Sequence, residues 1–293
     1  MTQTKGIFSA VAAFFSWVLV DTLVKLASLS AFPSMAILGL MGGVGIVGIL
    51  AVNRRNLAIL KPIHRRMHLL VGLCSLVSWY ANVIAFRHLP LTVFYPLVFT
   101  APLLIAWMST KLGHERMTLP KIVFLVTGFL GVLVAVGPRE TAGAEWIGYL
   151  ACAASVGAFA GSTIIIRKIS ATESSASILL SCAIAPTLLG LFGLLDLSRN
   201  TTIPDLGMIW LVLLAGVLNL LANAFYNKAL RHTSSTNVAQ LHYTQIIWGA
   251  CVGYVLWGEK LTWNLTLGAA MIIGAGLGTL LQARKEDRAA STA

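Results

Sequence analysis

The stretch RHTSSTNVAQLHYTQIIWGACVGYVLWGEKLT, residues 231–262, repeats an earlier stretch of the same chain. It aligns without a gap on RHLPLTVFYPLVFTAPLLIAWMSTKLGHERMT, residues 87–118, at an offset of 144 residues, and nine of the 32 positions are identical. The matches include the Arg-His pair that opens each stretch and the Glu and Thr near its end, which shared apolar composition does not readily produce. An offset of 143 places Lys25 on Lys168. The chain is therefore predicted to be built from two repeats.

The composition of the chain predicts that lipid is its solvent. The 293 residues are 57% hydrophobic and 11% charged, with a mean hydropathy of +0.84. Soluble domains average about 25% charged residues, and a soluble chain of this size has no core large enough for so much apolar surface. A helix crosses a bilayer with about 20 apolar residues. Ten such runs are present, at 7–27, 33–52, 69–87, 92–111, 119–137, 146–166, 174–195, 207–228, 235–257 and 263–282.

The ten runs divide equally between the repeats, which we place at residues 1–143 and 144–283. Residues 284–293 form a polar tail that is predicted to be disordered. Because five spans is an odd number, the second repeat enters the membrane inverted relative to the first. Many secondary transporters are built this way, with the substrate site near the midplane between the halves. The predicted fold is therefore all-α, with ten transmembrane helices as two inverted five-helix repeats.

The distribution of positive charge predicts the orientation in the membrane. The net charge is +11, and 16 of the 21 Lys and Arg residues fall on the cytoplasmic side if the N-terminus is cytoplasmic. This bias is typical of loops that stay inside the cell, and basic loops bind anionic lipid headgroups. We expect a multi-pass protein of the bacterial inner membrane with both termini cytoplasmic. Its partners are then the lipid bilayer and a small-molecule substrate, not a nucleic acid.

The sequence carries no pattern that indicates a metal centre, a cofactor or catalysis. All four cysteines fall inside predicted spans without a CxxC pair, so neither a zinc site nor a disulfide framework is expected. No HExxH, GxGD or GxSxG motif and no carboxylate pair within a span occurs. A transporter is thus favoured over the two alternatives, an intramembrane enzyme and a passive channel.

The ends of the fourth helix of each half carry a resemblance to a known family. LGHERMT (112–118) and WGEKLT (257–262) resemble the G-E-x-L-T-type signature of the EamA family of the drug/metabolite transporter superfamily. FSWVLVDTLVKLAS (15–28) is also similar to the first helix of that family. The resemblance implies ten helices, alternating access without ATP, and a central cavity lined by helices 1, 3, 4, 6, 8 and 9.

Within that family, the size and aromatic lining are similar to those of bacterial amino-acid exporters, including exporters of aromatic amino acids. The chain also departs from the family pattern. Many relatives carry an arginine in the second helix, where this chain reads AILGLMGG (36–43). His114 precedes the glutamate of the first half, whereas Gly258 precedes that of the second. The substrate therefore does not follow from the resemblance alone.

Polar and aromatic residues align on one face in each of the six helices that the resemblance places around the cavity. Polar groups in a span usually face the bundle interior or water. The alternative is that they only bond neighbouring helices or, for Trp17 and Tyr80, anchor the interface. The candidate substrate-binding residues are Trp17, Tyr80, Asn82, Tyr95, Phe99, Phe159, Asn219, Asn223, Gln240, His242, Tyr243 and Gln245.

A second set of residues has a predicted gating or structural role. Asp21 and Lys25 are four residues apart, which favours an ion pair on one helix face over a substrate role. Prolines in a helix interior remove a backbone hydrogen bond and kink the helix. The two signature glutamates are predicted to pair with loop cations or to act as gates. The set comprises Asp21, Lys25, Pro96, Pro102, Glu115, Lys168 and Glu259.

Together these features predict a secondary transporter for small neutral or zwitterionic metabolites, with export of amino acids as the first choice. Nucleosides, vitamins and drug-like solutes are the alternatives. An anionic substrate would call for an arginine clamp in the spans, which the sequence lacks. The glycine-rich segments at 39–48 and 268–278 permit close helix packing, and a homodimer is the second interpretation of them.

Overall fold

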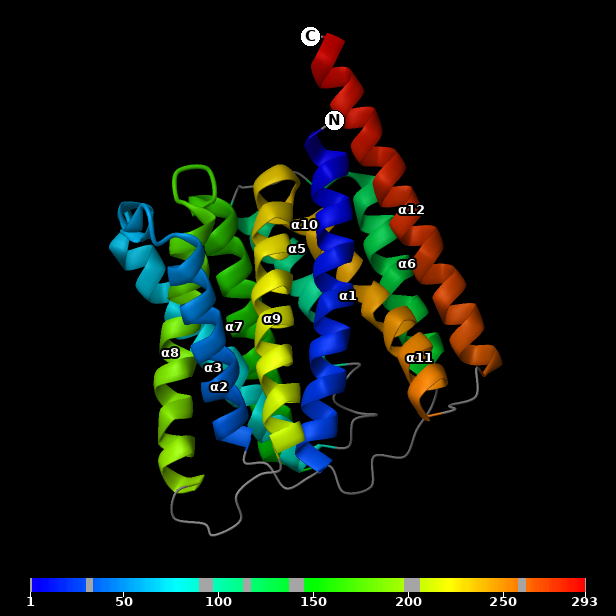
Figure 1. Ribbon diagram of the computed structural model, residues 1–293. Coiled ribbons are helices and arrows are strands. Elements are labelled where there is room, and N and C mark those ends of the chain that lie inside the picture. Colours follow the sequence, from blue (N-terminus) through cyan, green and yellow to red (C-terminus); the bar gives the residue numbers. More distant parts are fainter. Residues whose placement is uncertain are drawn as a thin grey trace.

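A computed structural model describes residues 2–29, 34–89, 97–112, 117–136, 145–197, 206–257 and 262–292. Within these ranges the chain forms helices, turns and loops, and no strand occurs. Figure 1 shows long helices packed side by side, with the N- and C-termini at the same end of the bundle. We call this the terminal end of the molecule.

Most of the helices lie where spans were predicted; the exceptions are α5, which begins at Ala101, and α12, which continues to Thr292. Six of them, α1, α2, α7, α8, α9 and α12, are long and apolar enough to cross a membrane, and α6 contributes a shorter apolar stretch at Leu119–Ala135. The α-helices are α1 (Thr2–Leu29), α2 (Ser34–Val52), α3 (Arg65–His88), α5 (Ala101–Lys111), α6 (Leu119–Val136), α7 (Trp146–Ile169), α8 (Ser175–Leu197), α9 (Leu206–His232), α10 (Ser235–Gln240), α11 (Thr244–Trp257) and α12 (Trp263–Thr292), with 3₁₀ turns η1 (Leu57–Leu60) and η2 (Leu241–Tyr243).

The span predicted at 235–257 is not one continuous helix. It consists of α10, the turn η2 and α11. The Thr244 hydroxyl donates to the carbonyl of Leu241 at 2.6 Å, and a hydroxyl that bonds the nearby backbone competes with the helical pattern. In the first repeat, Thr100 donates to Leu97 at the same distance of 2.6 Å, just before α5. Because both pairs are identical in the alignment, the two repeats share one local backbone feature.

Pro102 was predicted to kink the interior of a helix, and this is wrong. Proline occupies the first turn of α5, which begins at Ala101. A proline is tolerated there because the first turn of a helix has no acceptor for its backbone N–H. Pro186, in contrast, does lie inside α8. Pro96 lies outside the described residues.

The predicted disorder of residues 284–293 also differs from the structure, in which α12 continues to Thr292. The stretch QARKEDRAA (282–290) contains mainly good helix formers. Extending an existing helix requires no new nucleus. Polarity therefore places this tail outside the membrane but does not end the helix.

The packing of the helices follows the repeat. The most extensive contacts pair α1 with α9, α3 with α7, α2 with α8 and α6 with α12. Under the sequence offset, α1 corresponds to α7 and α3 to α9, so the first pairing maps onto the second. The α2–α8 and α6–α12 pairings map onto themselves. A two-repeat architecture fits this exchange of partners.

Glycines allow close approach at both of the pairings that map onto themselves. A Cβ atom built on Gly39 of α2 would lie 2.7 Å from the carbonyl carbon of Gly190 in α8. A Cβ atom on Gly131 of α6 would lie 2.9 Å from the carbonyl oxygen of Gly268 in α12. Side chains cannot occupy such space without moving a backbone. Gly39 and Gly268, one in each glycine-rich segment, thus serve helix packing within the chain.

Candidate substrate site

Six ring-bearing residues from α1, α7, α9, η2 and the segment before α5 form a packed group. We call it the aromatic cluster: Phe14, Trp17, Phe99, Phe159, Tyr226 and His242. The imidazole of His242 stacks on the ring of Phe14, with centroids 4.9 Å apart and planes within 12°. The rings of Phe99 and Phe159 lie 5.4 Å and 5.6 Å from the imidazole. These spacings are typical of favourable aromatic pairs. His242 is therefore enclosed by rings from α1, the segment before α5, and α7.

The indole of Trp17 extends the cluster toward α9. Its ring centroid lies 5.1 Å from that of Tyr226 and 6.4 Å from that of Phe159. The hydroxyl of Tyr226 is 2.7 Å from the hydroxyl of Thr163, and both groups are buried. Tyr226 thus meets α7 through a hydrogen bond as well as through ring contacts. The cluster joins α1 and α9 to α7, across the two repeats.

His242 carries an unsatisfied polar atom inside this apolar group. The residue is 7% exposed, and its Nδ1 has no hydrogen-bond partner in the described part of the chain. A buried polar atom without a partner is unfavourable by about 1–3 kcal/mol. Gln245 approaches the same ring from one turn further along. The nitrogen is therefore available to a polar group that enters the cluster.

Two asparagines connect the aromatic cluster to a small cavity. The Trp17 indole N–H donates to Asn219 Oδ1 at 3.2 Å. The amide of Asn223 donates to the same oxygen at 3.0 Å and to the Asn219 carbonyl at 2.8 Å. Both asparagines line a cavity of about 70 Å³, which is space for a few water molecules. Binding of a larger solute at this position requires its walls to separate.

Part of the cavity wall was not foreseen from the sequence, which assigned no lining role to helices α2 and α8. Gly42 and Gly45 of α2 and Pro186 of α8 line the cavity together with Ser75 and Cys182. The interior proline of α8 was the available signal, because a proline within a span requires neighbouring groups to satisfy a freed carbonyl. Glycines give no polar pattern, so the α2 wall was not detectable from periodicity.

Several other predicted residues lie outside the aromatic cluster, and one of them, Tyr243, adjoins it with its ring centroid 6.3 Å from that of Phe99. Asn82 accepts a hydrogen bond from Ser155 at 2.7 Å, which links α3 to α7. Gln240 accepts from Thr279 of α12 at 2.6 Å. The ring of Tyr243 packs against Gly128 of α6, and Tyr80 is 40% exposed on α3. For Asn82 and Gln240, the contacts are those of helix packing, the alternative considered for such residues.

The predicted gate residues are described only in part. Asp21 is exposed on α1, and Lys168 is exposed in the last turn of α7. Tyr95, Pro96, Glu115 and Glu259 lie outside the described residues, and so does the side chain of Lys25. The predicted Asp21–Lys25 ion pair and the roles of the two glutamates therefore stay predictions.

Comparison with known proteins identifies the family. The sequence pattern of the EamA-like transporter family matches residues 4–137 and again residues 146–281, one match per repeat. The chain belongs to the EamA-like transporter family. This membership identifies a transporter rather than an enzyme, and the apolar helices place it in a membrane as a multi-pass protein.

Named relatives of this EamA-like transporter are bacterial. It is 26% identical to the pseudopaline exporter CntI of Pseudomonas aeruginosa over 274 residues, which cover 92% of this chain and 94% of the exporter. It is 21% identical to a riboflavin transporter of Brucella anthropi, over 79% of this chain and 82% of that protein. A crystal structure with 19% identity superposes with a TM-score of 0.79 and covers 96% of this chain, which shows the shared fold.

Proposed function

We propose that this EamA-like transporter moves neutral or zwitterionic amphipathic metabolites across the inner membrane, with export of amino acids as its first assignment. The observation that carries the proposal is the aromatic cluster around His242. Its rings offer large π-faces, and Asn219, Asn223 and the free Nδ1 of His242 offer neutral hydrogen-bonding groups. Pockets for small organic solutes combine an apolar wall with a few polar groups in this way. Aromatic amino acids match both features.

The transport mechanism we propose is alternating access between two inverted repeats. The exchange of helix partners under the sequence offset supports two equivalent halves. Five predicted spans in each half, together with termini at the same end of the bundle (Figure 1), support an inverted relation between them. The positive-inside bias supports a cytoplasmic terminal end. A reporter fused after Ala293 should read as cytoplasmic.

A second substrate class has its own support. One relative is named a riboflavin transporter, so vitamins and other ring-bearing solutes are the alternative assignment. Another is named an exporter, which supports the outward direction. The aromatic cluster accommodates either class, because stacking on rings does not require an amino-acid backbone.

The test is uptake into proteoliposomes of a panel of amino acids, nucleosides, vitamins and organic anions, with and without a pH gradient. The proposal expects saturable, protein-dependent uptake of neutral or zwitterionic solutes and none of multiply charged anions. Uptake only of anions would contradict it. Uptake only of vitamins would replace the first assignment by the second.

A further inference from the structure

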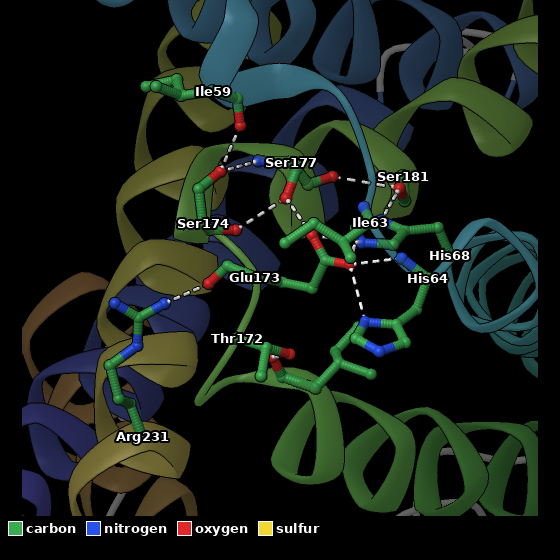
Figure 2. Close-up of polar contacts among 11 residues, drawn as sticks. Ile59, Ile63, His64, His68, Thr172, Glu173, Ser174, Ser177, Ser181 and Arg231 are labelled. Carbon is green, nitrogen blue, oxygen red and sulfur yellow. Dashed lines mark hydrogen bonds and ion pairs between the residues drawn. The ribbon is translucent and has the colours of Figure 1, made fainter.

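A buried carboxylate at the terminal end has no part in the site described above. Glu173 lies in the connection between α7 and α8, and its side chain is only 1% exposed. One carboxylate oxygen accepts hydrogen bonds from the backbone N–H groups of Ile63 and His64, at 2.9 Å and 2.7 Å. Figure 2 shows the carboxylate between the rings of His64 and His68, which belong to the other repeat.

Two imidazoles flank this carboxylate. His64 Nδ1 lies 3.1 Å from one oxygen of Glu173, and His68 Nε2 lies 3.3 Å from the other. His68 Nδ1 is also 2.6 Å from the hydroxyl of Ser181, which donates to the Ser177 carbonyl at 3.0 Å. His68 is thus held by its hydrogen bond to Ser181, while its Nε2 makes no hydrogen bond within the described residues and faces Glu173 by proximity alone.

Further contacts hold the Glu173 segment in place from both repeats. The guanidinium of Arg231, at the end of α9, donates to the backbone carbonyl of Glu173 at 2.7 Å. The hydroxyl of Ser174 donates to the carbonyl of Ile59 in η1 at 2.6 Å. The α2–α3 connection of the first repeat is thus bonded to the α7–α8 connection of the second. We call Glu173, His64, His68, Ser174 and Arg231 the polar latch.

The polar latch adjoins the cavity at its terminal-end side. Ser181 bonds His68, and the next residue along α8, Cys182, lines the cavity. On α3, Ser75 lines the cavity two helical turns beyond His68. Separation of α3 from α8 at the latch would therefore open a path between the cavity and the terminal end.

Glu173, the carboxylate of the latch, has no acidic counterpart in the first repeat. The offset of 143 that aligns Lys25 with Lys168 places Glu173 on Ser30. No Asp or Glu occurs anywhere from residue 22 to residue 114. Among the described residues, the buried carboxylate at the terminal end differs from the carboxylate–histidine pair at the other end, Glu145 with His88, where the Glu145 side chain is 60% exposed.

We propose that the polar latch is a gate lock, which holds the terminal end closed in the resting protein and must release before a solute can pass there. The proposal rests on alternating access by this transporter and adds the group that sets which end is closed. Because Glu173 is ionised and buried, it holds the closed end only while its N–H and imidazole partners stay in place. Loss of the charge therefore favours the open end.

The test is the labelling rate of Cys182 by a membrane-impermeant maleimide that reaches only the terminal end, in inside-out vesicles. Cys74, Cys152 and Cys251 are first replaced by Ala in the full-length chain. We expect Glu173→Gln to raise the rate about tenfold, because it removes a charge-assisted set of hydrogen bonds. Ser181→Ala, which removes a partner of His68 without unpairing a buried charge, should raise it less, in the same direction.

The matched control is Glu145→Gln at the opposite end of α3 and α7. Glu145 also pairs with a histidine, His88, at 2.7 Å, but its side chain is 60% exposed, so the labelling rate should not change. If monodisperse Glu173→Gln and Ser181→Ala proteins both label at the wild-type rate, the latch is refuted. The measurement needs no substrate, so a failed latch leaves the transport assignment intact. If the wild type transports none of the proposed solutes but Cys182 labels faster in the latch variants, the transport assignment is refuted and the latch is supported.

Discussion

At the scale of single residues, the account depends on a few polar atoms placed among rings. Trp17, Phe159, Asn219, Asn223 and His242 were predictable, because polar and aromatic side chains inside apolar runs need partners away from lipid. The structure brings these five together around the aromatic cluster and its cavity. Periodicity indicates which face of a helix is polar, but it does not distinguish a residue that lines a cavity from one that bonds a neighbouring helix.

Replacement of Trp17 by Phe separates its ring from its hydrogen bond. Phenylalanine keeps a stacking surface but loses the N–H that binds Asn219. A neutral hydrogen bond contributes about 1 kcal/mol, so we expect KM to rise roughly fivefold with little loss of folded protein. The same substitution at Trp146, which is 70% exposed, should change neither the KM nor the amount of folded protein. Equal KM values for both variants would remove the Trp17–Asn219 contact from substrate binding.

The latch residues could not have been predicted from the sequence. His64, His68 and Glu173 lie in or beside connections, where charged side chains are usually solvated. Ile63 lies 110 residues before Glu173 in the sequence. Only the folded chain shows that the backbone N–H of Ile63 binds the Glu173 carboxylate. No pattern within one repeat contains this information, because each repeat supplies one side of the latch.

Acid should release the latch through Glu173. Burial raises the pKa of Glu173, but hydrogen bonds from the backbone and ring of His64 and the charge of His68 outweigh it and hold the pKa below the usual value. A lowered pKa means that the carboxylate stabilises the closed end at neutral pH and stops doing so as the pH falls through that value. Arg231 faces the Glu173 backbone and stays charged throughout.

The measurement is the distance between spin labels on Leu57 and Thr172, two exposed positions on either side of the latch. The distance distribution of the wild type should be narrow at pH 7 and should broaden only at pH values lower than those that protonate an ordinary glutamate, about pH 4, because the pKa of Glu173 is lowered. Glu173→Gln should be broad at both pH values. A wild-type distribution that stays narrow in acid would contradict the role given to the charge.

At the scale of helices and turns, the boundaries were largely predictable, and the breaks were not. Runs of apolar residues located most of the spans, because lipid imposes length and hydrophobicity, but they missed the start of α5 and the end of α12. The turn η2 falls inside such a run. An apolar run does not indicate where a threonine hydroxyl will bond the nearby backbone and break the helix. The identical Leu and Thr pairs of the two repeats, Leu97 with Thr100 and Leu241 with Thr244, were the available signal.

The shared break before α5 and α11 should act as a hinge. Thr244→Val removes the hydroxyl that bonds Leu241 and favours a continuous helix, so we expect slower transport with a change in unfolding free energy below about 1 kcal/mol. Thr110→Val removes the same kind of bond, to Ala106, within an unbroken helix. Initial rates per inserted protein should fall for the first variant only. Similar rates for both would show that the break does not move during transport.

Close packing of α2 on α8 gives a test of the helix pairing. Gly39→Ala places a Cβ against the Gly190 backbone, and overpacking of this kind destabilises by about 1–3 kcal/mol. Gly43 lies on the same helix, and a Cβ there has open space around it. Thermal unfolding in detergent should therefore show a lower Tm for Gly39→Ala and an unchanged or higher Tm for Gly43→Ala. The reverse order would contradict the α2–α8 contact.

At the scale of the whole molecule, the two-repeat organisation is the best-supported feature. It was predicted from an internal alignment, and a family match to each half fits it. The direction of transport and the substrate depend on the side chains grafted onto the fold, so the fold does not determine them. The wall formed by α2 and α8 and the latch arise only when the halves are packed together.

The central claim is that the aromatic cluster binds the transported solute, and solute counterflow tests it most directly. Proteoliposomes loaded with an unlabelled neutral aromatic amino acid are diluted into the labelled solute, and exchange is measured for wild type, Trp17→Ala and Trp146→Ala at equal insertion. The account predicts exchange by wild type and by Trp146→Ala, with a loss of at least tenfold for Trp17→Ala, since Trp17 is a partly buried aromatic anchor and removing such an anchor typically costs about 2 kcal/mol or more. Wild-type exchange by Trp17→Ala for every solute that wild type carries would contradict it.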